Sequence, residues 1–260
     1  MTRAAAWWLT LSVLGAGACG DDDGGAPRDD AGAPDASTLD AASPPPAPTV
    51  TIRGALADLL GATPFEPIEV CVHERPDIPC VHTDDEGAYA LAGVPADSDI
   101  ALTLRDGANA YQPELLPLHT PAVDITFSPR ILETELVGQL EDRAGVSLDP
   151  ARSVVLFYAS AGPSGGLPGV SAELVPDDAE ALAYVTSSLS VSTTATETTM
   201  AGMGLFLDVP EGEHRLRFSY EGRACAATPG SWEGDEPGEL RAPSVAGYWV
   251  VVGQSGCATP

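Results

Sequence analysis

An internal repeat is the feature that most constrains how this chain can fold. The segment 52–61 (IRGALADLLG) matches the segment 136–145 (LVGQLEDRAG), 84 residues later. Four positions are identical in the two segments: Gly54 and Gly138, Leu56 and Leu140, Asp58 and Asp142, Gly61 and Gly145. In the same register, the apolar residues at 70 and 72 correspond to those at 154 and 156. Each copy is therefore predicted to hold a strand, a turn built on Asp and Gly, and a second strand.

A second shared pattern follows in both copies. The first copy has TDDEGAYAL at 83–91 and then Val94-Pro95, and the second has Thr199, GLFL at 204–207 and then Val209-Pro210. Stretches of alternating apolar residues come next, at 100–104 (IALTL) and 214–218 (HRLRF). The pattern predicts a turn ending in glycine, a strand with an inward aromatic side chain and a corner, followed by another strand.

Strands without intervening helices are typical of antiparallel sheets that pack face to face. The 27 glycines and 24 prolines agree with many short strands and turns. We therefore predict an all-β fold, with two tandem antiparallel β-sandwiches of transthyretin-like or immunoglobulin-like type after a disordered tether. The first sandwich is expected at 49–130, and the second, more divergent one at 131–260.

These motifs resemble those of a known family. The order G-x-L-x-D-x-x-G, strand, T-D-x-x-G-x-Y-x-L and V-P is similar to the carboxypeptidase regulatory-like domain, a transthyretin-like β-sandwich. The resemblance covers 49–130 well and 134–258 more loosely. Because the shared residues are those of turns and core positions, the resemblance implies a fold and not an activity.

The second copy is longer than the first by an insertion at about 159–198. It contains a glycine-rich loop, a segment at 177–184 that can form a short helix, and a Ser/Thr-rich run. The loop residues 162–166 (GPSGG) match G-x-S-x-G around Ser164, but the following Leu-Pro-Gly cannot open the helix that a nucleophile elbow needs. We interpret the match as a flexible loop. Loops added to a rigid sandwich are where specificity usually resides.

The first 18 residues have the three parts of an export signal. Arg3 gives a positive start, 4–13 (AAAWWLTLSV) is apolar, and small residues follow at 15–18. Ala16-Gly17-Ala18-Cys19 resembles the lipobox of bacterial lipoproteins, although leucine is usual where Ala16 stands. The resemblance implies cleavage before Cys19 and a lipid on its thiol; ordinary secretory cleavage is the alternative. Since Gly20, and not aspartate, follows the cysteine, the outer membrane is the expected location.

The segment 20–48 is expected to be a disordered, acidic tether. It has one sizeable apolar residue, Leu39, no aromatic residue, and seven aspartates against a single arginine. Such a segment cannot bury enough apolar area to offset the entropy lost on ordering. A calcium site is the alternative, but the aspartates lack the ligand spacing of a calcium loop.

The cysteine count of five is odd. With Cys19 assigned to lipid, Cys71 pairs with Cys80 and Cys225 with Cys257, because an exported protein meets an oxidising compartment. The C-x-H pattern at 71–73 and 80–82 also allows a zinc site of two cysteines and two histidines. We expect the disulfide, which removes both thiolate ligands, and therefore neither metal nor cofactor.

The charge of the chain and its motifs also limit the classes of function that are expected. The chain has 38 acidic residues against 12 basic ones, a net charge of −26, so no nucleic-acid partner is expected. No catalytic residue can be singled out. Trp232 is a candidate ligand contact that could stack on a sugar; packing against its own domain is the alternative. We expect a non-enzymatic, lipid-anchored envelope protein presenting its sandwiches to a protein or glycan. The alternative is an accessory unit of a polysaccharide or peptide hydrolase, with its site in 159–198.

Overall fold

The computed structural model describes residues 47–59, 62–64, 66–162, 165–186, 190–228, 230–254 and 256–257. The predicted signal peptide, Cys19 and the tether up to residue 46 lie outside these ranges, as does Ser164. Within the described ranges, no helix has the length and apolar character needed to cross a membrane.

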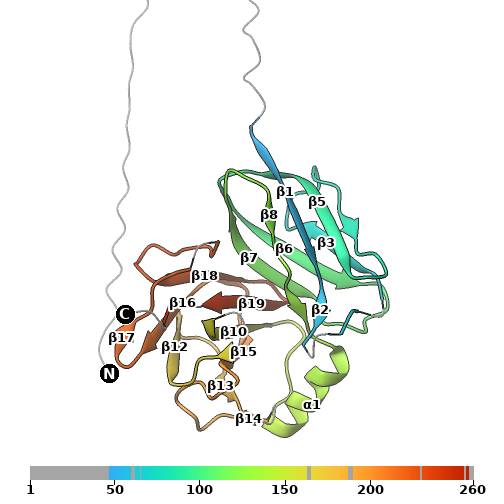
Figure 1. The fold of residues 1–260 in the computed structure, drawn as a ribbon. Helices are drawn as coiled ribbons and strands as arrows, with labels where there is room; N and C mark the ends of the chain where they lie inside the picture. Colours follow the sequence, from blue (N-terminus) through green and yellow to red (C-terminus); the bar gives the residue numbers. More distant parts are fainter. Residues whose placement is uncertain are drawn as a thin grey trace, which may run out of the picture. The chain divides into compact units, whose positions relative to one another are not determined.

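The chain is built almost entirely of strands, which confirms the predicted all-β fold class (Figure 1). The elements of its first half are β1 (Thr49–Ala55), β2 (Ala57–Asp58), β3 (Ile68–Val72), β4 (Val81–His82), β5 (Ala88–Pro95), β6 (Ser98–Asp106), β7 (Glu114–Thr120), β8 (Ile125–Thr126) and β9 (Arg130–Ile131). Those of its second half are α1 (Thr134–Ala144), β10 (Ser153–Gly162), β11 (Gly165–Gly166), β12 (Val170–Val175), β13 (Ala181–Val185), β14 (Val191–Ser192), β15 (Met203–Val209), β16 (Gly212–Tyr220), β17 (Arg223–Ala224), β18 (Glu239–Ser244) and β19 (Trp249–Gln254).

The first half packs two sheets over one hydrophobic cluster. One sheet has the order β5-β1-β8, and the other consists of β7, β6, β3 and β4. Alternate side chains of β1 and β3 point inward, so that Ile52 and Val70 are fully buried between the sheets. Tyr89 of β5 lies in the same cluster, as its pattern predicted, and its hydroxyl donates to the Phe127 carbonyl at 2.7 Å. Burial raises the pKa of this hydroxyl.

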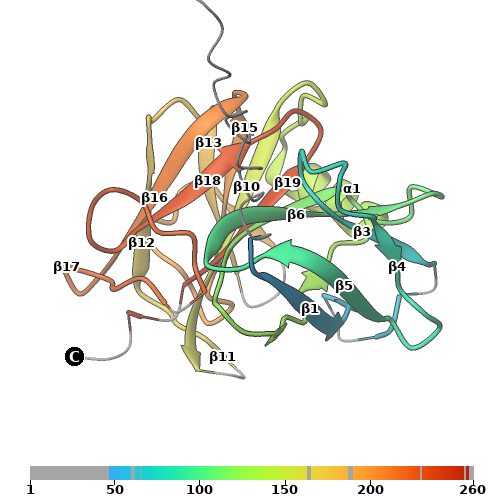
Figure 2. The ribbon, with the colours of Figure 1, turned by 90° about the horizontal axis from the view of Figure 1, so that it is seen from above.

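The second half packs β12, β16, β17 and β18 against a sheet that contains β13, β15, β10 and β19 (Figure 2). The cluster between them is rich in aromatic residues, and Phe157 is its central ring. Phe206, the counterpart of Tyr89 in the repeat, is buried here as predicted. The predicted strand at 214–218 lies within β16.

Helix α1 covers the other face of the sheet formed by β10, β15 and β19. Val137 of the helix packs there against Leu156, Leu205 and Trp249 in a third cluster. Both faces of the sheet are thereby buried, and every residue of β15 is buried. This explains why the first five residues of β15, 203–207 (MGLFL), are apolar and do not alternate with polar ones.

Strand β19 joins the two halves of the molecule. It pairs in parallel with β10 along six residues, and its Trp249 and Val250 pair in parallel with Glu114 and Leu115 of β7. A single ten-stranded sheet therefore runs from β14 in the second half to β4 in the first. The sequence analysis predicted antiparallel strands and did not anticipate this parallel junction.

Two local predictions were wrong. Residues 136–145, which match the first strand of the repeat, form most of α1 and its cap. The apolar residues of this segment follow helical spacing, with Val137 and Leu140 buried and Leu136 half-buried. Gly145 ends the helix in the left-handed conformation, and its N–H donates a hydrogen bond to the Glu141 carbonyl. The segment 177–184, expected as a possible short helix, instead leads into strand β13. In both places tertiary packing outweighed the local pattern.

Candidate ligand-binding groove

A groove of about 600 Å³ lies where the two halves meet. One wall comes from β7, β8 and the residues around them, including Pro117 and Ile125. The other wall comes from β18 and the loop before it, and β10 and β19 contribute the residues between. The parallel pairing of β19 with β7 brings these segments together, because it aligns strands more than 130 residues apart in the sequence.

Trp232, the candidate contact from the sequence, lines this groove. Its side chain is half-buried and also packs against the aromatic cluster, as the alternative interpretation of this residue expects; ligand contact stays a prediction. Backbone hydrogen bonds secure its loop on two sides: the Trp232 carbonyl accepts the Arg241 N–H at 2.8 Å, and the Gly230 carbonyl accepts the His119 N–H at 3.0 Å. The backbone that carries the indole is therefore fixed at the edge of the groove.

A buried carboxylate organises the turn between Trp232 and β18. Glu239 is fully buried. Its Oε1 accepts a hydrogen bond from Arg217 Nε at 3.1 Å and pairs with Arg217 Nη2 at 3.0 Å. Its Oε2 accepts the Asp235 N–H at 3.2 Å. Since a buried charge is costly unless it is paired and hydrogen-bonded, these contacts are what hold Glu239 in place.

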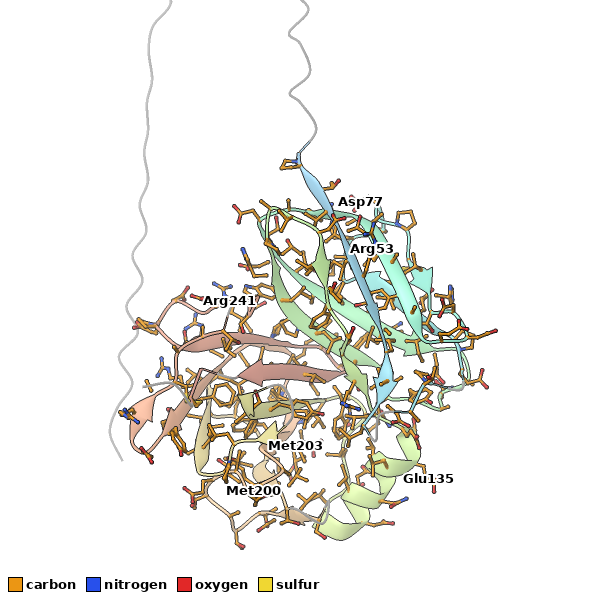
Figure 3. All side chains as sticks on the ribbon, in the orientation of Figure 1. Arg53, Asp77, Glu135, Met200, Met203 and Arg241 are labelled. Atoms are coloured by element: carbon orange, nitrogen blue, oxygen red, sulfur yellow. A yellow bond between two sulfur atoms is a disulfide. The ribbon has the colours of Figure 1, made fainter. Side chains whose placement is uncertain are left out.

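Arg241 stands beside the indole. It projects from β18 (Figure 3), with its guanidinium carbon 5.9 Å from the centre of the Trp232 ring and its Nη2 3.3 Å from Asp235. The Nε of Arg241 is buried and has no hydrogen-bond partner among the described residues. An arginine over an aromatic face contributes a modest cation–π attraction and keeps the ring oriented.

Two further polar side chains line the groove. The phenol of Tyr158, on β10, has its pKa raised by burial and also by the nearby Glu114. The ring of His119, on β7, contacts Asp99 at 2.8 Å through Nδ1 and Asp97 at 3.5 Å through Nε2. The hydrogen bond to Asp99 raises the pKa of His119, and burial opposes this shift. Both ring nitrogens of His119 therefore lie beside carboxylates.

The predicted cysteine pairs are both present as disulfides. Cys71 bonds to Cys80 and Cys225 to Cys257, with S–S distances of 2.07 and 2.03 Å. The bonded sulfurs are not available as zinc thiolates. His82 is exposed, and His73 is half-buried with its ring centre 6.3 Å from that of Tyr248.

The described residues on either side of Ser164 pair with each other. Gly162 of β10 pairs with Gly165 of β11, and the chain continues through a turn into strand β12. A nucleophile elbow needs a helix after the turn, and the described residues that follow form no helix. Of the insertion 159–198, Ser160 lines the groove.

Of the residues that line the groove, the sequence singled out Trp232 and, within the insertion 159–198, Ser160. It gave no indication of the others. Arg241 and Tyr158 lie in ordinary strand patterns, and Pro117 and Ile125 belong to the other half of the chain. No local signal marks them, because they become neighbours only through the β19–β7 pairing.

Comparisons with known proteins give limited information. No family model and no curated protein matches the chain. Among solved structures, the Bacillus anthracis TIE protein is 9% identical with a TM-score of 0.26, over 80% of this chain and 34% of that one. The shaft pilin SpaA of Lactobacillus rhamnosus GG is 11% identical with a TM-score of 0.24, over 82% and 99%. The minor pilin GBS52 of Streptococcus agalactiae is 10% identical with a TM-score of 0.25, over 81% and 96%. This chain spans about a third of the TIE protein's length. No assignment of function follows from likenesses at this level.

Proposed function

We propose that this chain is an exported, lipid-anchored, non-enzymatic module that binds a glycan in the groove beside Trp232. Two sandwich modules, 49–130 and 131–260, present the groove between them. The observation that carries the proposal is a half-buried tryptophan, on a loop held by backbone hydrogen bonds, in the lining of a groove of about 600 Å³. Small-ligand sites are typically concave, largely preformed and of this size.

The lining favours a sugar. An indole face and aliphatic side chains such as Ile125 offer apolar contact to the C–H face of a sugar ring, and Tyr158 and Ser160 offer hydroxyl groups to its hydroxyls. The groove's charged lining residues are Arg241 and His119, each already beside a carboxylate. The arrangement thus suits a neutral, amphipathic ring.

Replacing the indole tests the proposal. Trp232→Ala removes the aromatic wall, and we expect affinity for glycans selected on an array to fall at least about 30-fold, the effect of losing an interface hot spot. Trp232→Phe keeps a ring in place and is expected to retain much of the affinity. Isothermal titration calorimetry measures both, with circular dichroism to show that each variant is folded. Unchanged affinity in a folded Trp232→Ala protein would contradict the proposal.

The lipid anchor rests on the lipobox-like sequence and on the cysteine count. The two disulfides use four of the five cysteines, which leaves Cys19 free for acylation. Mass spectrometry of the mature protein is expected to show an N-terminal Cys19 carrying lipid, in an outer-membrane fraction. Cys19→Ala is expected to release the protein into the soluble fraction. A mature chain that starts elsewhere, without lipid, would show that the signal is an ordinary secretory one.

A further inference from the structure

A second groove, of about 470 Å³, also has Trp232 in its lining. Strand β18 and the residue after it line both grooves: Leu240 and Arg241 face the first, and Pro243, Ser244 and Val245 face the second. Trp232 lines both. The two grooves therefore share Trp232 and take successive residues of a single strand into their linings.

The second groove contains a buried hydroxyl that lacks a partner. Ser244 is 2% exposed, lines this groove, and its Oγ has no hydrogen-bond partner among the described residues. An unsatisfied buried polar group is unfavourable, so a native one calls for an explanation. A hydroxyl both donates and accepts, so this group is able to bond to a hydroxyl or an ammonium group.

The two grooves differ in charge. Four carboxylates line the second groove: Glu74, Asp99, Glu211 and Glu213. They face one arginine, Arg75, whose guanidinium is already bound to Asp77 at 2.8 Å, and His73. Asp99 is likewise bonded to His119 at 2.8 Å, and Glu74 lies 3.9 Å from His73, so Glu211 and Glu213 are the two carboxylates of this lining without an ion pair among the described residues. No carboxylate is among the residues that line the first groove. The second groove therefore attracts a cationic group and repels an anionic one.

We propose that the two grooves hold successive units of one linear glycan, and that the second groove selects amino sugars with a free ammonium group over acidic sugars. The inference deepens the proposed function and rests on it. The indole contacts the glycan at the point where the glycan passes from one groove to the next. The Ser244 hydroxyl bonds to a polar group of the sugar unit in the second groove, and the carboxylates neutralise the ammonium charge of that unit.

Oligosaccharides of defined length and charge test this directly. Calorimetry on the full exported protein would compare glucosamine oligomers, their N-acetylated forms and oligogalacturonates, each from one to six units. We expect affinity to rise with length beyond a single unit. We also expect glucosamine oligomers to bind about tenfold more tightly than N-acetylated ones, and this preference to weaken as salt is added. Oligogalacturonates are expected to bind most weakly.

Variants assign the selectivity to the second groove. The double variant Glu211→Gln, Glu213→Gln is expected to remove most of the preference for glucosamine oligomers over N-acetylated ones. Ser244→Ala is expected to lower the affinity for oligomers and to leave the affinity for single units unaffected. The control is Glu135→Gln with Asp142→Asn, which removes the same charge from exposed positions of α1. This control is expected to keep the full preference.

The outcomes separate the two proposals. If Trp232→Ala abolishes binding but single units bind as tightly as hexamers, or galacturonates bind best, the two-groove inference is wrong while the proposed function stands. Loss of the glucosamine preference in the α1 control would also overturn the inference, since net charge would then explain it. If no oligosaccharide binds in a Trp232-dependent way, the proposed function itself fails.

Discussion

Raising the pH from about 5 to above 8 is expected to lower the free energy of unfolding by about 4 kcal/mol through a single carboxyl group, that of Glu114. Glu114 is the first residue of β7 and is fully buried at the β7–β19 junction, opposite Trp249. Its Oε1 accepts the Leu132 N–H at 2.8 Å, and its Oε2 has no hydrogen-bond partner among the described residues. Burial raises the pKa of this carboxyl from 4.5 to about 8, and the Leu132 hydrogen bond opposes the shift.

The direction of the effect follows from where the proton is bound. Below about pH 4.5 the carboxyl is protonated in both the folded and the unfolded chain, and the stability is fully present. Between about 4.5 and 8 the folded chain holds a proton that the unfolded chain has lost, so stability falls by up to about 1.4 kcal/mol per pH unit. Above about pH 8 the carboxylate is charged in both states and the loss is complete.

Comparing wild type with Glu114→Gln isolates this contribution from that of the other carboxylates. The amide is neutral at every pH and still accepts the Leu132 N–H, but it places an unpartnered N–H₂ group in the core, which costs about 1–3 kcal/mol. Urea unfolding from pH 5 to 9 should show the variant less stable at pH 5 and more stable at pH 9. Glu135→Gln, on the outer side of α1 (Figure 3), is the control and should follow the wild type. Parallel pH profiles for wild type and Glu114→Gln would refute the prediction.

Phe157→Ala is expected to destabilise the protein by about 3–5 kcal/mol, the range for deleting a buried phenylalanine. The Phe157 ring is fully buried, with its centre 5.9, 5.7 and 5.5 Å from those of Tyr184, Phe206 and Phe218. It belongs to the cluster between the two sheets of the second half, so its removal leaves a cavity there. Thermal or urea unfolding measures the loss, and Phe157→Leu is expected to cost less.

A second substitution makes this prediction specific to one contact. Gly204 of β15 lies opposite Phe157 of β10, and a Cβ atom at Gly204 would overlap the Phe157 ring. Gly204→Ala should therefore be destabilising in the wild type and much less so, or stabilising, in the Phe157→Ala background. A double-mutant cycle is expected to give a coupling within the 0.5–3 kcal/mol range of residues in contact. Additive effects would show that the ring does not rest on Gly204.

Regular local patterns predicted much of the fold. The strands at 70–72, 100–104 and 204–207 were predicted from apolar spacing, and all lie in strands. The cysteine pairs were predicted from the compartment and the count, and both disulfides are present. The second copy of the repeat failed at 136–145, where a few identical residues coincided with helical spacing. Four identical residues in ten did not determine the secondary structure there, because Val137 and Leu140 pack onto the sheet from a helix.

The sequence by itself determined the fold class, the cysteine pairing and one residue of the groove, Trp232, because each depends on neighbours in the chain or on composition. Only the tertiary structure decided that β19 would lie between β10 and β7. That pairing buries Glu114 and places Trp232 opposite Pro117 across a groove. Contacts between strands so far apart depend on which faces remain to be covered once each half has packed, and no local stretch of sequence records this.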